Sequence, residues 1–195
     1  MPQISTPEFA ALPLRVHAFL ADVPLHDSWV VELPKPRSGI TLEAFRQASG
    51  GRLLTPSPIV RTLLTFRVWI GSVFGWDGER EQKAAKTNAP TFADRLSPAD
   101  RAASLAPAGT SDGAFHVVYR LANEGLDEIL NATVHAGMLF ALVENANSYR
   151  FYLAVYVRNV NRLTPFYMAL IDPVRKVIVY PSLLRSVRAT WEKAF

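Results

Sequence analysis

The chain has 195 residues, 49% of them hydrophobic, and a formal net charge of +4. A chain of this length and apolar content can bury one continuous core, so we predict a single domain over residues 1–195. The sequence contains no cysteine, which excludes disulfides, thiolate metal ligands and a cysteine nucleophile.

The first residues lack the basic start and apolar run of a secretory signal. No stretch approaches the roughly 18 uncharged apolar residues that a membrane span needs. The absence of cysteine also fits a reducing compartment. We therefore expect a cytoplasmic protein without a membrane span.

The first quarter of the chain predicts two strands and a helix. Residues 14–20 and 28–33 alternate between apolar and polar side chains, as half-buried strands do. Thr41 is placed as an N-cap before a short apolar run, which predicts a helix over residues 42–48.

The strongest helical period covers residues 57–75, where Arg67 falls inside an otherwise apolar face. A buried guanidinium needs a partner, because it cannot shed its charge. The structural interpretation pairs Arg67 with Glu128, which begins the apolar face of its own strand. The alternative is that Arg67 anchors an anionic head group of a ligand.

Residues 77–114 show no strand pattern, and only Ser97 is placed to start a short helix. Three segments rich in Val, Tyr, Phe and Leu follow, at residues 115–122, 126–143 and 149–159. Turn-forming residues connect them, which predicts an antiparallel meander.

From Thr164 the period becomes helical again, with Thr164 as N-cap and a proline in the first turn. We predict a long C-terminal helix, kinked or split at Pro173 and Pro181, since proline removes a backbone donor. One stripe of this helix would hold Tyr167, Leu170, Ile171, Val174, Val177, Ile178, Leu184, Val187 and Trp191.

No motif assigns a reaction. The four histidines, His17, His26, His116 and His135, lack the spacing of a zinc site, so a metal would need partners distant in the sequence. Neither a nucleophile elbow nor a phosphate-binding loop is present. We predict no catalytic residue, no cofactor and no metal.

Strand alternation places His135 on one face with Asn131 and Thr133. The simpler interpretation is a solvated outer face that carries His135. The sharper interpretation is a polar ladder that lines a pocket, with His135 as a hydrogen-bonding group or general base.

Aromatic side chains are frequent in the predicted strands, and they could fill a core or line an apolar cavity. The residues that we select as candidates for ligand binding are Arg67, Tyr119, Glu128, His135, Phe140 and Tyr152.

The C-terminal part is basic, with Asp172 and Glu192 as its acidic residues between Arg158 and Lys193. A nucleic acid or an anionic membrane could bind such a surface. The basic residues are interspersed with apolar ones, which is typical of a solvated helix face. We therefore expect no nucleic-acid partner.

Three segments resemble the bacterial family known as domain of unknown function 2867. They are FHVVYRLANEG at 115–125, ATVHAG at 132–137 and LTPFYMALIDPVRKVIVYPSLL at 163–184. Where family members often show Pro-Phe-His, this chain has Pro173-Val174-Arg175. Just before His135, this chain has Asn131 and Thr133 at positions where acidic residues would be expected.

The resemblance implies an α+β fold similar to helix-grip proteins (START-like, SRPBCC-type). A curved antiparallel sheet then wraps the C-terminal helix and leaves an apolar cavity. The cavity implies an apolar or amphipathic small molecule as ligand. Some members carry the domain after a nucleotide-binding, oxidoreductase-like domain, which implies an oxidoreductase partner protein here, since this chain has no Gly-x-Gly-x-x-Gly motif.

Three functions stay open at this point. The first is binding of a small molecule or lipid-like ligand between the sheet and the C-terminal helix. The second is an enzyme of cyclase, isomerase or hydrolase type that uses the same cavity. The third is an interaction module whose basic C-terminal helix binds a protein or an anionic surface. The oligomeric state is not predicted.

Overall fold

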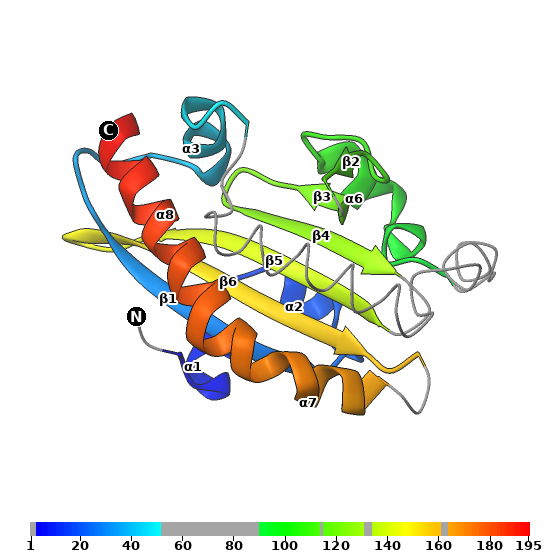
Figure 1. The fold of residues 1–195 in the computed structure, drawn as a ribbon. Helices are drawn as coiled ribbons and strands as arrows, with labels where there is room; N and C mark the ends of the chain where they lie inside the picture. The colour runs from blue at the N-terminus through cyan, green and yellow to red at the C-terminus, as the bar shows by residue number, and fades with distance from the viewer. Residues whose placement is uncertain (1–2, 52–89, 114, 131–133, 161–163) are drawn as a thin grey trace.

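The computed structural model describes residues 3–51, 90–113, 115–130, 134–160 and 164–195. The predicted helix at 57–75, with Arg67, and the polar residues Asn131 and Thr133 lie outside these ranges. The described residues form an α+β, helix-grip-like fold in which a curved antiparallel sheet packs against a C-terminal helix (Figure 1).

The sheet has six strands in the order β1-β6-β5-β4-β3-β2, and every neighbouring pair is antiparallel. The five consecutive strands β2 to β6 form an antiparallel meander, where three strands were predicted, and β1 pairs with β6. The strands are β1 (Leu25–Pro34), β2 (Ser111–Asp112), β3 (Phe115–Arg120), β4 (Glu124–Leu130), β5 (His135–Glu144) and β6 (Ser148–Arg158).

The single strand predicted at 126–143 is wrong. That stretch belongs to two antiparallel strands, β4 and β5, in which Leu130 lies opposite His135. The predicted strand was much longer than the usual 3–10 residues or so, and its apolar composition hid the reversal. Strand β4 also begins at Glu124, inside the predicted connection.

The C-terminal helix consists of α7 (Thr164–Val174), the π-helical η2 (Arg175–Val179) and α8 (Tyr180–Ala194). The predicted interruption therefore lies between Pro173 and Pro181, where each proline withholds a backbone donor. The predicted apolar stripe is wrong at this interruption, because the π turn adds a residue and rotates the helix face. Val177 is 74% exposed, whereas Leu184, Val187 and Trp191 are buried. Val174 and Ile178 are exposed as well.

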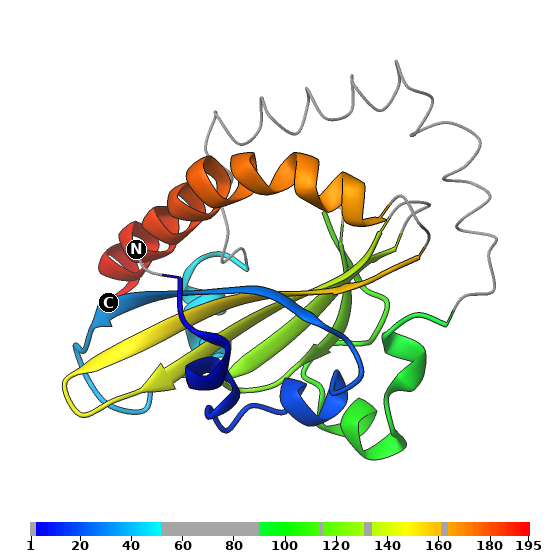
Figure 2. The same cartoon turned by 90° about the horizontal axis from the view of Figure 1, so that it is seen from below.

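One face of the sheet packs against the C-terminal helix, as Figure 2 shows from the side. Trp29, Val31 and Leu33 of β1 point to this face, as their alternation predicted. Trp191 of α8 is buried here, and its indole Nε1 donates to the carbonyl of Pro34 at 2.9 Å.

Short helices cover the opposite face (Figure 2). They are α1 (Thr6–Ala10), α2 (Val16–Phe19), η1 (Ala93–Arg95) and α6 (Pro98–Ala103). The strand predicted at 14–20 is wrong, because α2 forms there. The carboxylate of Glu124 accepts hydrogen bonds from the amides of Arg15 and Val16 at 2.7 and 3.2 Å, which caps this helix from the sheet.

The predicted helix starts at Thr41 and Ser97 are confirmed. Thr41 caps α3 (Leu42–Ala48) by accepting from the amide of Ala44, and Ser97 caps α6 by accepting from Asp100. In the described part of 77–114, the chain also forms the short strand β2, where no strand was predicted. Among the described residues, no helix is both long and apolar enough to cross a membrane.

Candidate functional site at the junction of β1 and the C-terminal helix

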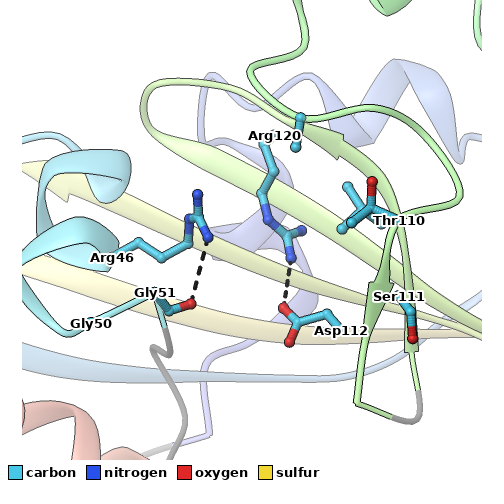
Figure 3. Close-up of a pocket in the computed structure, with 9 residues that line it drawn as sticks. Arg46, Gly50, Gly51, Thr110, Ser111, Asp112 and Arg120 are labelled. Carbon is cyan, nitrogen blue, oxygen red and sulfur yellow. Dashed lines mark hydrogen bonds and ion pairs between the residues drawn. The ribbon is translucent and has the colours of Figure 1, made fainter.

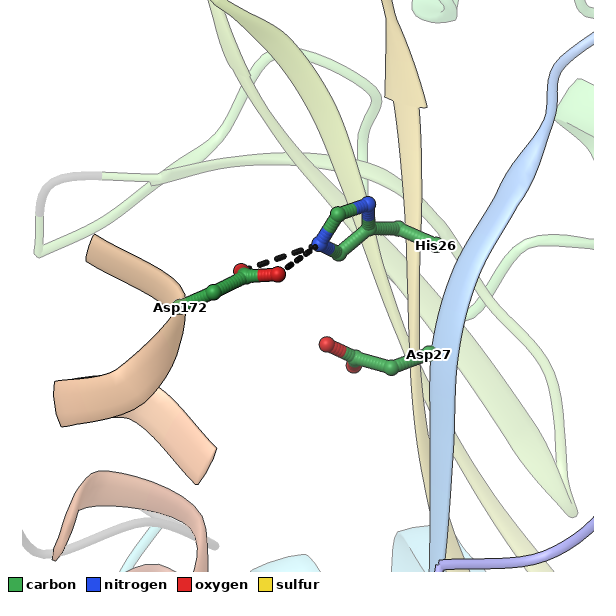
Figure 4. A group of neighbouring side chains, drawn as sticks. All are labelled: His26, Asp27 and Asp172. Carbon is green, nitrogen blue, oxygen red and sulfur yellow. Dashed lines mark hydrogen bonds and ion pairs between the residues drawn. The ribbon is translucent and has the colours of Figure 1, made fainter. Parts of the chain in front are cut away.

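A bulge in β1 places two polar side chains next to each other. Leu25 pairs with Tyr156 and Asp27 pairs with Val155, so His26 is an extra residue in the strand. Bulges re-aim side chains and are frequent beside functional sites. Here His26 and Asp27 both reach the side of the sheet that carries the C-terminal helix (Figure 4).

The helix supplies the facing groups from the segment around its π turn. Asp172 lies in the last turn of α7, just before Pro173, and Arg175 and Lys176 open η2. Because they follow Asp172 by three and four residues, Arg175 Nη1 and Lys176 Nζ lie 2.9 and 3.1 Å from its carboxylate oxygens. A π-helical turn is rare and is found frequently at functional sites.

The two elements meet through hydrogen bonds and ion pairs. His26 Nε2 lies 2.9 Å from both carboxylate oxygens of Asp172, although the two residues are 146 positions apart in the sequence (Figure 4). Arg175 donates to Asp27 Oδ2 at 3.3 Å and to Asp172 Oδ1 at 2.9 Å. It also donates to the hydroxyl of Tyr180, over whose ring it lies. The guanidinium thus bridges both carboxylates.

One carboxylate oxygen of Asp27 lacks a hydrogen bond from the described residues. The residue is 3% exposed, and its Oδ1 has no hydrogen-bond partner among the described residues. Burial raises the pKa of its carboxyl above the ordinary value, while Arg175 and His26 act in the opposite direction. A buried carboxylate oxygen without a donor is costly in free energy, so this atom needs an explanation.

Asp172 is in the opposite electrostatic situation. Its partial burial favours the neutral acid, but hydrogen bonds from His26 and Lys176 outweigh it and hold the pKa of this carboxyl below its ordinary value. The side chains of Asp172 and His26 are 17% and 25% exposed, so molecules from solution can reach the pair. Two carboxyl groups with pKa values moved apart, beside an accessible imidazole, form an arrangement that can bind a polar group or transfer a proton.

The candidate residues selected from the sequence do not gather at this junction. Phe140 is buried on the same face of the sheet as the C-terminal helix. Tyr119 and Tyr152 belong to the core on the opposite face. Glu128 and His135 also lie on that opposite face, beside Phe92, and Arg67 lies outside the described residues.

His135 is not on a solvated face, as the simpler interpretation had it, because it is 2% exposed. Its Nε2 lies 2.8 Å from Glu128 Oε2, and its ring stacks on Phe92 at 3.8 Å between centroids. The segment before η1 covers this part of the sheet, which alternation alone cannot reveal. A carboxylate–imidazole pair is therefore present, with the acid seven residues before the histidine.

Glu128 is almost fully buried and has three described partners. Besides His135, it accepts hydrogen bonds from the amides of Phe92 and Ala93 at 2.7 and 3.1 Å. These bonds attach the chain around η1 to β4. The predicted pair with Arg67 stays a prediction, because Arg67 is outside the described residues.

Tyr119 donates to Glu124 Oε1 at 2.6 Å, the same carboxylate that caps α2. Burial, together with Glu124, raises the pKa of Tyr119 far above its ordinary value. The ring of Tyr152 contacts that of Phe9 in the same core. Both tyrosines hold the N-terminal helices on the sheet.

A second polar site lies near the end of α3, where a hollow of about 270 Å³ is lined by Arg46, Asp112 and Arg120 among others (Figure 3). Arg120 pairs with both carboxylate oxygens of Asp127 and with Asp112. Arg46 pairs with Glu43 in the same two-oxygen manner. Because acidic side chains already occupy both guanidinium groups, this hollow is a weaker candidate for an anion.

The junction site could not be found from the sequence, because its members are far apart in the chain. His26 and Asp27 carry no recognisable spacing, and Asp172 appeared only as one acid in a basic segment. The adjacent polar pair His26-Asp27 at the start of an apolar strand was the available signal.

The family model for DUF2867, described as a protein of unknown function, matches residues 19–182. The chain belongs to this family. The DUF2867 match includes His26, Asp27 and Asp172 and ends in the first turn of α8. The comparisons found no matching curated protein and no matching solved structure.

Proposed function

We propose that this DUF2867 protein binds an apolar or amphipathic small molecule between the sheet and the C-terminal helix. The polar group of that molecule meets the cluster of His26, Asp27 and Asp172. The partly buried apolar side chains of Ala136, Met138 and Ile171, at the edge of the core on this side of the sheet, supply apolar surface.

The observation that carries this proposal is the buried Oδ1 of Asp27, which has no hydrogen-bond partner among the described residues. Leaving a buried polar atom unsatisfied costs roughly 1–3 kcal/mol, and a bound ligand, an ion or an ordered water can supply the missing partner. The neighbouring His26 and Asp172 are partly exposed, which gives a route to the buried atom.

Native mass spectrometry of the full chain as purified tests the proposal. We expect a population with a bound small molecule, reduced in Asp27→Asn and in His26→Asn. Glu192→Gln is a matched control, because Glu192 is exposed and pairs with Arg188, four residues away on the same helix. A wild-type protein that carries no molecule, and whose melting temperature no amphipathic compound raises, argues against the proposal.

A second candidate function is proton-transfer catalysis of cyclase, isomerase or hydrolase type in the same place. It is favoured by the geometry of the cluster, in which the buried carboxyl of Asp27 lies close to the partly exposed pair of His26 and Asp172. The raised pKa of Asp27 and the lowered pKa of Asp172 are consistent with one protonated and one ionised carboxyl group. The alternative of an interaction module is less favoured, because Arg175, Lys176 and Arg188 are engaged in ion pairs within the helix.

A cytoplasmic location and an oxidoreductase partner protein remain predictions from composition and from the family resemblance. Neither is needed for ligand binding. Co-purification of a tagged full chain, with identification of its partners, tests the second.

A further inference from the structure

We propose that His26, Asp27 and Asp172 bind a divalent first-row transition metal ion, with an open coordination position toward the small molecule. The inference rests on the proposed function for the role of that open position. The metal site itself rests on the side chains of the cluster and can be tested without any organic ligand.

The three residues offer the right donor atoms in the right place. One imidazole nitrogen and one oxygen from each carboxylate all lie within 4.8 Å of one another. Ligand atoms bound at about 2.0–2.2 Å to one ion lie roughly 3–4 Å apart, so a contraction of about 1 Å brings the three together. The partly exposed side chains of His26 and Asp172 can make this movement.

The second observation is the state of Asp27. Its carboxylate points toward Asp172 (Figure 4), yet its Oδ1 has no hydrogen-bond partner among the described residues. A metal ion between the carboxylates would engage an oxygen that the guanidinium of Arg175 leaves unsatisfied. This atom distinguishes the cluster from an ordinary group of surface acids.

Arg175 occupies the position that a cation would take. It bridges Asp27 and Asp172, and Lys176 also contacts Asp172, so the two acids and two bases balance in charge. A metal must therefore displace the guanidinium from at least one carboxylate. Arg175 retains Tyr180 as a partner when it moves, which limits the cost of the displacement.

The donor set indicates the class of metal. Imidazole suits zinc, iron, nickel and copper, whereas a calcium or magnesium site is built from oxygen donors alone. Three protein ligands with an open position are typical of sites at which a bound oxygen is polarised. A carbonyl, carboxylate or hydroxyl oxygen of the small molecule is the matching group.

The test is titration of the metal-free full chain with Zn²⁺ by calorimetry. A second titration, with Co²⁺, is followed by visible absorption. We expect one ion per chain, and a loss of affinity of at least about tenfold in each of His26→Asn, Asp27→Asn and Asp172→Asn. Arg175→Gln removes the competing cation, so it should bind Zn²⁺ more tightly than the wild type. Glu192→Gln should leave the affinity unchanged.

Lys176→Gln is a second competitor variant in case Arg175→Gln fails to fold, because the side chain of Lys176 is 39% exposed and its ion pair with Asp172 lies within the same helix. It should also tighten Zn²⁺ binding. Absence of binding in the wild type and in Lys176→Gln overturns the inference, as does equal binding in all three ligand variants. If Zn²⁺ binds but no small molecule accompanies the protein, the metal site stands and the proposed function fails. If a small molecule accompanies the protein but Zn²⁺ does not bind, the proposed function stands and the metal site fails.

Discussion

His26 Nε2 lies 2.9 Å from both carboxylate oxygens of Asp172, and this contact joins the bulge of β1 to the end of α7. The pair sits beside the buried Asp27, so three titratable groups share one junction. Their environments differ enough that substitution of each acid should have a different dependence on pH.

Asp172→Asn should lower the free energy of unfolding by about 1–2 kcal/mol at neutral pH, since it removes an acceptor shared by charged donors. The pKa of Asp172 is lowered in the folded state, so the stability it contributes is present above its ordinary value. That contribution disappears as pH falls through the lowered folded pKa. Urea unfolding of wild type and variant between pH 2 and 8 measures it, and a constant difference across this range contradicts the assignment.

Asp27→Asn should show the opposite trend. Burial raises the pKa of Asp27 in the folded state, so ionisation weakens the wild-type fold as pH rises from the ordinary value to the raised one. The variant lacks this loss, and its stability relative to the wild type should increase over that window. The same urea series tests it. A relative stability that falls as pH rises would show that Arg175 dominates over burial.

Glu128→Ala should destabilise the protein by about 3 kcal/mol or more, because it removes a buried acceptor from two backbone amides and from His135. Hydrogen exchange should become faster at the amides of Phe92 and Ala93. Glu128→Gln keeps one acceptor oxygen and should cost less. The exposed Glu32→Gln is the control, and equal protection at residues 92–93 in Glu128→Ala would contradict the role of this carboxylate.

Trp191→Ala should cost about 3–5 kcal/mol in the free energy of unfolding, as expected for a large aromatic residue removed from a packed core. Its ring contacts Phe45 and Tyr149, and its indole donates to Pro34. Trp191→Phe keeps most of the ring contacts and should lose less. A thermal melt of Trp191→Ala that matches the wild type would mean that α8 contributes little to the core.

Binding to random duplex DNA should be weak and should vanish near physiological ionic strength. Although the C-terminal segment is basic, Arg175, Lys176 and Arg188 are already paired with acidic side chains of the same helix. Fluorescence anisotropy with labelled DNA at several salt concentrations is the measurement. Tight binding at about 150 mM salt would favour the interaction-module alternative.

The sequence by itself determined the elements whose signals are local. Alternation in 28–33 and 149–159 predicted β1 and β6, and the hydroxyl groups of Thr41 and Ser97 predicted the starts of α3 and α6. These predictions succeed because capping and strand alternation depend on residues only a few positions apart. The family resemblance also came from the residue patterns of three segments, 115–125, 132–137 and 163–184.

Only the tertiary structure decided the features that depend on distant partners. Residues 14–20 contain a helix because Glu124 caps it from the sheet, and His135 is buried because Phe92 covers it. The junction of His26, Asp27 and Asp172 likewise needs β1 and the C-terminal helix to meet. Local periodicity records which face a side chain points to, but not which element packs on that face, and burial and charge pairing depend on that packing.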